Sequence, residues 1–388
     1  MFVAWRETCE HWISHLSSCL RALDLTSKLC VAVVLHADDP VLLSSSQGAA
    51  QDALRCMARW AYVHKAAFHA GPSKSVVLVI EGAPQPVLFQ LVIGSHTTRL
   101  TVKHRHRYLG LLWPASLCFL QTVLQHISIA DGIVVQIVSL IEAGLPLPFG
   151  LLLFESKVDG FLRFGRWLLA ADMQSLHVYE SAFDRWTKQL LGLQPWRNAA
   201  VASMECGWNY SGDRRAVIDI ALRRARLWLL PDSDLYSALF RRCHHGHTQG
   251  SWAQKSLDIL RLYSVPDLPE LGLPLMPLSR YKAVVCETLC AASADMWWSG
   301  CESHVLPLPY KGIRADKQLV PSVLLQPGVS WDALVGIRNL IKLRAGALDL
   351  AHCAGRRKKC QREILYLLWE ENPLWLFALP WRMYHQCL

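Results

Sequence analysis

The sequence predicts an α+β protein in which a small sheet-forming part precedes a longer, mostly helical part. Between residues 31 and 113, short runs of β-branched and aliphatic residues alternate with Gly, Pro and Ser, which is typical of strands separated by turns. From about residue 115, apolar residues recur at the spacing of amphipathic helices. The chain has 388 residues, 52% of them hydrophobic and 18% charged, so it can bury a large core over two or three domains.

The sheet-forming part is expected to begin with a β-hairpin. Apolar runs at residues 31–35 and 41–43 lie on either side of a short acidic turn, Ala37-Asp38-Asp39. A helix is expected over about 47–64, because its apolar residues share one helical face. Those face residues are Leu54, Met57, Ala58 and Ala61. Short strands are expected at 76–80, 87–93 and 99–102, and a second hairpin at 107–113.

The rest of the chain is expected to be helical, with a boundary where prolines gather. Residues 265–278 contain four prolines and are expected to form a linker. Helices are expected near 117–143, 150–171, 176–193, 214–230, 233–243, 251–263, 279–297, 330–346 and 356–370. Four regions follow: 1–30, an N-terminal helical segment; 31–114, the sheet-forming region; 115–264, a helical domain; and 265–388, a C-terminal helical region of unassigned role.

Composition indicates an intracellular protein, nuclear or cytoplasmic. The longest apolar region, 133–154, is interrupted by polar residues and prolines, so no membrane span is expected. The first twelve residues lack the basic-then-apolar order of a signal peptide. The 13 cysteines are an odd number and are scattered, which indicates buried thiols in a reducing compartment rather than a disulfide framework. A net charge of +9 is compatible with a polyanionic partner.

The acidic turn is the most informative short motif. Two adjacent carboxylates at a hairpin tip repel each other, and their burial costs solvation free energy. A divalent cation removes that cost, because hard cations prefer oxygen ligands. Two-metal phosphoryl transfer, as in polymerases, is the chemistry that most often needs such a pair. The alternative is an acidic turn with only a structural role, which is the commonest origin of an Asp-Asp pair.

The order of these features resembles the C-terminal palm and thumb of reverse transcriptases of the non-LTR (LINE-like) retrotransposon type. The family's Tyr/Phe-Ala-Asp-Asp box corresponds to His36-Ala37-Asp38-Asp39, and its next helical segment to 44–64. Lys74 precedes a strand, as a lysine does in the family, and Tyr108-Leu109-Gly110 matches the hairpin that grips the primer. The segments 186–193 and 205–208 resemble the thumb, and the resemblance covers about residues 30–230.

The resemblance implies a role for each matched residue. Asp38 and Asp39 would be catalytic carboxylates that bind Mg²⁺ or Mn²⁺, and Lys74 would lie near the phosphates of the incoming nucleotide. Tyr108, Leu109 and Gly110 would hold the primer. The family activity is RNA-directed DNA polymerase, a nucleotidyltransferase, with an RNA template and a DNA primer as partners. Residues 31–114 would be a partial palm, and 115–264 a thumb-like domain.

Departures from the family pattern predict that this chain is inactive by itself. Two-metal catalysis needs carboxylates from two strands, and the family's first catalytic aspartate lies on a strand well upstream of the acidic hairpin. Among the 37 residues before Asp38 the sole aspartate is Asp24, in a helix-like segment. The Gln-Gly motif of the nucleotide pocket is absent, and His36 replaces the aromatic residue. Pro40 follows the pair and cannot donate to a strand ladder.

Two groups of arginines are expected to contact nucleic-acid phosphates. Arg105 and Arg107 precede the primer-grip hairpin, and a second group lies on a thumb-like helix. The second group is Arg223, Arg224 and Arg226. Solvated helix faces are the alternative, and phosphate contact would make the affinity fall with salt. The densest basic run is 356–359.

Two Cys/His clusters have the composition of zinc ligands but not its usual arrangement. The cluster at 243–247 places donors next to one another, which rarely closes a tetrahedron. The set Cys286, Cys290, Cys301 and His304 has a compatible order, but its first pair lies on an apolar helical pattern. Buried thiols and a polar loop are therefore favoured over zinc.

The sequence thus predicts a truncated retrotransposon-type reverse transcriptase that retains the second half of the palm and a thumb. The alternative, from another class, is a non-catalytic helical module that binds nucleic acid or protein. Half a palm would leave an unpaired sheet edge and uncovered apolar surface, so self-association is expected.

Overall fold

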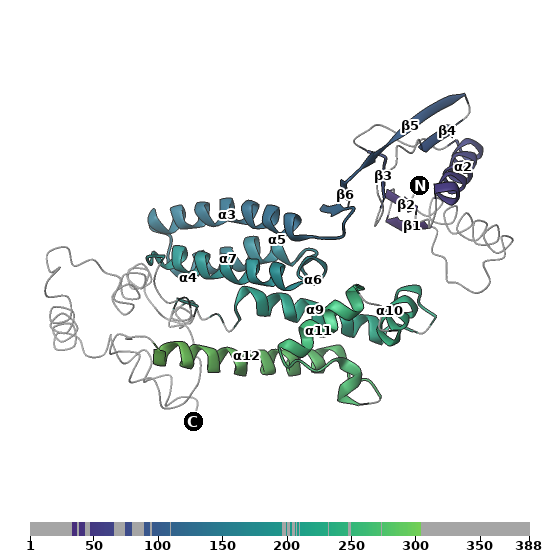
Figure 1. The fold of residues 1–388 in the computed structure, drawn as a ribbon. Coiled ribbons are helices and arrows are strands. Elements are labelled where there is room, and N and C mark those ends of the chain that lie inside the picture. The colour runs from purple at the N-terminus through teal and green to yellow at the C-terminus, as the bar shows by residue number, and fades with distance from the viewer. Residues whose placement is uncertain are drawn as a thin grey trace, which may run out of the picture. The chain divides into compact units, whose positions relative to one another are not determined.

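A computed structural model describes two compact units, Met1–Cys118 and Phe119–Leu388, which we call the sheet unit and the helical unit (Figure 1). Its described residues are 33–303 except 37–38, 43–46, 66–73, 80–88, 94, 109, 196–198, 200–201, 204–205, 207, 209, 232, 247–249 and 273. The N-terminal helix expected within 1–30 and the helices expected after 303 lie outside these residues. The architecture is α+β, as predicted: a small mixed sheet with hairpins, and then helices.

The sheet unit begins with the predicted hairpin. Strand β1 (Val33–His36) pairs antiparallel with β2 (Asp39–Leu42), and His36 lies opposite Asp39. Two residues, 37 and 38, therefore connect the strands, and Asp39 is the first residue of β2 rather than part of the loop. Pro40 lies opposite Leu35 within the ladder, so the missing N–H does not prevent the pairing.

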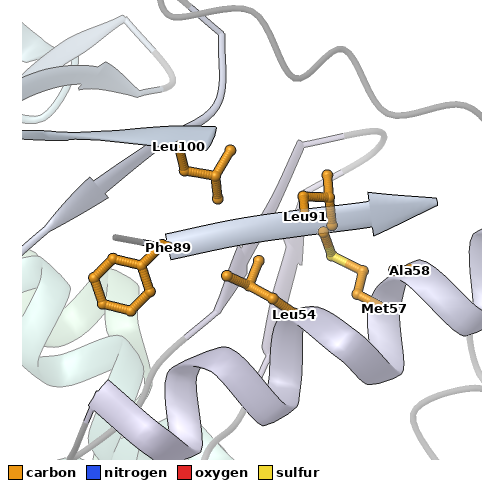
Figure 2. Close-up of a cluster of buried hydrophobic side chains, with 6 residues drawn as sticks. All are labelled: Leu54, Met57, Ala58, Phe89, Leu91 and Leu100. Atoms are coloured by element: carbon orange, nitrogen blue, oxygen red, sulfur yellow. The ribbon is translucent and has the colours of Figure 1, made fainter. Parts of the chain in front are cut away.

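A helix and a three-stranded sheet form the core of this unit. In the sheet, β5 (His96–Lys103) runs parallel to β3 (Val76–Leu78) and antiparallel to β4 (Phe89–Ile93). Helix α2 (Gln47–Val63) buries the four face residues that the sequence predicted. Figure 2 shows this contact, in which Leu54, Met57, Ala58, Phe89, Leu91 and Leu100 pack together. Leu42 of β2 and Val77 of β3 pack against the same cluster, so one helix anchors the hairpin and the sheet.

A side-chain amide fixes α2 against the edge of this sheet. The Gln51 Nε2 donates to the Gln90 carbonyl oxygen at 2.7 Å, and the Gln90 N–H donates to the Gln51 Oε1 at 3.0 Å. Gln90 lies on β4, which β5 pairs on one side. An unpaired edge strand exposes backbone groups that attract other strands. Gln51 therefore satisfies the edge at this point while it sets the position of the helix.

The second hairpin is also present. Strand β6 (Arg105–Tyr108) pairs with β7 (Leu111–Pro114), and Tyr108 lies opposite Leu111. The loop contains Gly110 with φ of 81°, a left-handed conformation that glycine adopts without a steric penalty. The Ala115 N–H donates to the His104 carbonyl oxygen at 2.7 Å and closes the base of the hairpin. Strand β6 lies close to β3.

The helical unit follows the predicted order of helices, with one region divided. Its longer helices are α3 (Leu120–Glu142), α7 (Met173–Leu191), α9 (Gly212–Leu229), α10 (Leu235–His245), α11 (Trp252–Leu262) and α12 (Leu278–Ser303). Side chains of Asp172, Asp234 and Ser251 accept hydrogen bonds from the first-turn N–H groups of α7, α10 and α11, which fixes where these helices begin.

The single helix expected over 150–171 is divided into several pieces. These are α4 (Leu147–Leu153), a π-helical stretch (Phe154–Asp159), α5 (Gly160–Arg163) and α6 (Arg166–Leu169). The break after α5 falls at Gly165, whose φ of 74° is incompatible with a continuous right-handed helix. The apolar pattern continues through the break, which is why periodicity alone predicted one helix.

Helix α9 lies at the centre of the unit and packs against α6, α7, α10, α11 and α12. The proline-rich segment 265–278, expected to be a linker, is packed within this unit: Leu268 is fully buried, and the Tyr281 hydroxyl donates to the Pro266 carbonyl oxygen at 2.9 Å. Arg214 of α9 donates to Ser293 of α12 at 2.7 Å. In the described part of the chain, α12 and the preceding helices therefore form one unit.

Helix α3 carries an uncharged outer face. Leu124, Ile129, Val135 and Leu140 are exposed, with serine and glutamine between them. Among the described helices, α3 is long and apolar enough to cross a membrane. Core helices of soluble proteins can have the same length and composition. The half-exposed Asp131 accepts hydrogen bonds from Arg185 at 2.5 Å and from Trp186 at 2.6 Å and ties α3 to α7. The expectation of no membrane span stays a prediction, as does self-association through exposed apolar surface.

The close contact between α7 and α9 at Gly212 gives a stability prediction. A Cβ at Gly212 would lie 2.6 Å from the Phe183 ring and would overlap the Tyr179 carbonyl oxygen. We expect Gly212→Ala to lower the free energy of unfolding by about 1–3 kcal/mol, because the backbone of α7 must move. Thermal and urea denaturation followed by circular dichroism measure this change.

The matched control is Gly132→Ala on the outer face of α3, where an added Cβ meets nothing within 4 Å. This substitution should raise stability by about 0.5–1 kcal/mol through helix propensity alone. Equal effects of the two substitutions would show that α7 and α9 are not in close contact.

Candidate nucleic-acid interface

The strands next to Asp39 and Lys74 pack on one core, and neither residue is among the described members of that core. Lys74 is exposed and lies two residues before β3, and β2 and β3 both pack against α2 through Leu42 and Val77. The strand that begins with Asp39 and the strand that follows Lys74 are thus held by the same helix. Asp38 and Leu109 lie outside the described residues, and of Asp39 only the backbone is described.

The described residues do not complete a metal site around the acidic hairpin. Within them, no group of three His, Cys, Asp or Glu side chains could hold a metal ion. Asp52, another acid described in the sheet unit, is exposed on α2 and pairs with Arg55 at 2.7 Å. Because two-metal chemistry needs more carboxylates than one hairpin supplies, we derive no catalytic step through Mg²⁺ or Mn²⁺.

Strand β6 presents the first predicted basic group. Arg105 and Arg107 are exposed, while His106 and Tyr108 are half-buried, as the alternation of a strand requires. Burial, with a contribution from the charge of Lys103, lowers the pKa of His106. The imidazole is therefore neutral at pH 7, and the positive charge of this strand comes from the two arginines on its exposed face.

Strand β5 adds a basic residue that the sequence analysis did not select. Arg99 is exposed, and its neighbour Leu100 is buried beneath α2. The alternation of polar and apolar residues from His96 to Lys103 was the available signal, since it places Thr97, Arg99, Thr101 and Lys103 on the face opposite the core. This face of β5 is thus polar and carries positive charge.

In the second predicted basic group, Arg223, Arg224 and Arg226, one arginine is buried. Arg224 is fully buried, and its guanidinium forms an ion pair with Asp267. It also donates to the Ala253 carbonyl oxygen at 2.6 Å and to the Ser256 hydroxyl at 2.7 Å. A phosphate at the surface cannot reach a side chain that is enclosed in this way. Arg224 is therefore a core residue, and its expected contact with nucleic acid is wrong.

Arg223 and Arg226 remain at the surface of α9. Arg226 is exposed, and the Arg223 guanidinium lies over the Trp167 ring, 4.7 Å from its centroid. Burial, followed by repulsion from Arg226, lowers the pKa of Arg223. Neither side chain contacts a carboxylate among the residues that the structure describes. Two positive charges are thus held near each other without an acidic partner there.

The two Cys/His clusters are described only in part, and their described members belong to no group of three side chains that could hold a metal ion. Cys286 and Cys290 lie one turn apart on α12, while His304 and the side chain of Cys301 lie outside the described residues. The half-buried His244 packs its ring against Trp228 and Phe240. His247 lies outside the described residues.

A separate acidic group lies on α7 and α9. Burial, followed by the charge of Glu180, raises the pKa of Asp184 to about 6. Asp213 contributes to the same field and accepts a hydrogen bond from the Tyr263 hydroxyl at 2.6 Å. These carboxylates are not among any group that could hold a metal in the described residues. They repel anions, so a nucleic acid would not contact this part of the unit.

The assignment of Arg224 to the core makes a measurable prediction. Arg224→Met would leave Asp267 buried without its cation, and we expect a loss of about 3–5 kcal/mol in the free energy of unfolding. Urea denaturation of the full chain measures the loss. Arg226→Gln, two residues further along the same helix, should change stability by about 0.5 kcal/mol or less, because the side chain is exposed. A small effect at Arg224 would contradict the buried pair.

Comparison with known proteins assigns no family to this arrangement. No protein-family model, curated protein or solved structure matches the chain.

Proposed function

We propose that this chain is a palm-and-thumb portion of a retrotransposon-type RNA-directed DNA polymerase, which binds nucleic acid and does not extend a primer by itself. The observation that carries the proposal is the arrangement of the sheet unit. An acidic hairpin, a helix, a lysine before a strand and, later, a hairpin with a glycine in its turn occur in this order, and β2, α2 and β3 share one core. This is the order of elements that the sequence resemblance implied.

The positions of the basic side chains support contact with a polyanion. Arg105 and Arg107 share the exposed face of β6, and β6 lies close to β3, which follows Lys74. Phosphate oxygens accept charge-assisted hydrogen bonds from arginine, often two at once. A strand that presents two arginines on one face, about 7 Å apart by strand geometry, matches the spacing of successive phosphates along a backbone.

The acidic pair supports the proposal that this chain does not extend a primer by itself. Asp38 and Asp39 are neighbours in the chain, so a single hairpin supplies both carboxylates. Such a pair cannot clamp two ions about 3.5–4 Å apart without a carboxylate from another strand. In a complete enzyme of the family, the carboxylates that correspond to Asp38 and Asp39 would hold Mg²⁺ or Mn²⁺. The ion would stabilise charge during phosphoryl transfer.

A second candidate function is a nucleic-acid or protein binding module in which the acidic hairpin is only structural. The surface arginines of α9 favour it, because they belong to the helical unit and do not depend on the palm-like features. The two candidates differ in which arginines contribute to duplex binding. The palm-like function requires Arg105 and Arg107, and the module function does not.

The first test is primer extension by the purified 388-residue chain on an RNA template. We expect no extension with Mg²⁺ or with Mn²⁺, because one acidic hairpin does not hold both ions. Denaturing gel electrophoresis of a labelled primer measures the product. Extension that Asp38→Ala abolishes would refute the proposed lack of activity.

The second test concerns duplex binding. We expect the double variant Arg105→Gln/Arg107→Gln to bind a primer–template duplex more weakly. The slope of log K against log salt should become shallower by about 0.9 for each phosphate that the variant no longer neutralises. Fluorescence anisotropy across a salt series measures both quantities.

The control removes the same charge from the outer side of α2, by Arg55→Gln/Arg59→Gln, where both arginines are exposed. That variant should keep the wild-type slope. If both double variants change the slope equally, the binding reflects net charge alone, and the proposed interface on β6 is incorrect.

A further inference from the structure

The surface of α9 combines unpaired positive charge with exposed aromatic rings, and its neighbours explain why. Helix α9 packs beside α6 and α10 (Figure 1), and each contributes a ring near the arginines. Trp167 of α6 lies beneath the Arg223 guanidinium. Tyr236, in the first turn of α10, is 53% exposed, and its hydroxyl is near enough to affect the charge of Arg223. Phe164, just before α6, is 56% exposed.

Arg223 is preorganised in a way that a solvated arginine is not. Its guanidinium lies 4.7 Å from the centroid of Trp167, and its Nε is buried without a hydrogen-bond partner in the described part of the chain. Contact with a ring restricts the side chain, and a planar guanidinium also stacks readily on flat groups. Arg226, one turn away by sequence spacing, keeps that location positive.

From this combination we infer that Arg223, Arg226 and Tyr236 form a binding surface for single-stranded nucleic acid. The arginines bind backbone phosphates, and an unpaired base stacks on the exposed Tyr236 ring. Proteins that bind single strands combine positive charge along the backbone with aromatic rings on which bases stack. This inference rests on the proposed function only in that the chain binds nucleic acid.

A single strand fits this surface better than a duplex does. In a duplex the bases are already stacked and paired, so an exposed tyrosine gains little from contact with them. The carboxylates of Glu180, Asp184 and Asp213 lie elsewhere, on α7 and at the start of α9, so they do not neutralise the arginines. Asp219, one turn before Arg223, already accepts a hydrogen bond from Arg166 at 2.7 Å.

The experiment measures binding of a labelled single-stranded DNA of about 20 nucleotides, longer than the site of one binding domain, to the full chain by fluorescence anisotropy. We expect Tyr236→Ala to weaken binding about fivefold or more, since loss of one base–aromatic stack is worth roughly 1–3 kcal/mol. The variant keeps the start of α10, because Asp234 accepts from the backbone N–H of residue 236. We expect Arg226→Gln to weaken binding and to make the salt slope shallower by about 0.7.

Each variant has a matched control. Tyr62→Ala removes another exposed tyrosine, from α2 of the sheet unit, and Arg261→Gln removes another exposed arginine, from α11. Neither should change the affinity for the single strand by more than about twofold, the scatter expected of a surface substitution away from the site. If Arg261→Gln weakens binding as much as Arg226→Gln does, or if Tyr236→Ala has no effect, the inference is overturned.

The outcomes also separate this inference from the proposed function. Duplex binding that needs Arg105 and Arg107, together with single-strand binding that is insensitive to Tyr236, would overturn the inference and leave the proposed function standing. Single-strand binding that needs Tyr236 and Arg226, with duplex binding insensitive to Arg105 and Arg107, would support the inference and count against the palm-like function.

Discussion

The helical unit depends on the pairing of charges around α9. This helix packs against five others, so several of its charged side chains, Arg224 among them, lie where solvation is poor and an unpaired charge is costly. Arg224 pairs with Asp267, and Arg215 binds Glu155 through two nitrogens at 2.7 and 2.8 Å. Asp219 of α9 accepts from Arg166, which also binds the buried Asp159 at 2.6 Å. These pairs hold α9 to the π-helical stretch, to α6 and to the segment before α12.

The number of arginines near each buried aspartate sets the direction of its pKa shift. Burial alone would raise the pKa of Asp159, but the surrounding arginines Arg166, Arg215 and Arg163 together lower it below its usual value. Asp219 has fewer cations nearby, and burial leaves its pKa raised. Two aspartates that share Arg166 thus shift in opposite directions, because one has three arginines as neighbours and the other has mainly one. The network stabilises the fold only while Asp159 is ionised.

The sequence predicted the elements well where one face of each element is buried. Helix α2 shows this, because its four predicted face residues have no other place to pack than the sheet. The prediction was weaker where a polar residue lies on a buried face. Arg224 was grouped with its basic neighbours, yet it continues the apolar stripe of Val217, Ile220 and Ala221 at a helical spacing. That spacing was the available signal, and it was overlooked because three arginines in four residues look like one basic surface. The Asp267 partner, 43 residues away, could not be inferred from the local pattern.

The division of α9 into buried and exposed arginines also bears on function. A charge that is paired inside the fold serves stability, and its replacement says little about a ligand. Arg223 and Arg226 differ, because the fold holds them near each other and supplies no acid to either among the described residues. Such repulsion costs folding free energy that an aliphatic pair would not cost. The fold gains nothing from the repulsion, and a bound anion would relieve it. The unpaired arginines, rather than the more numerous paired ones, therefore mark the face of the helical unit at which a polyanion is expected.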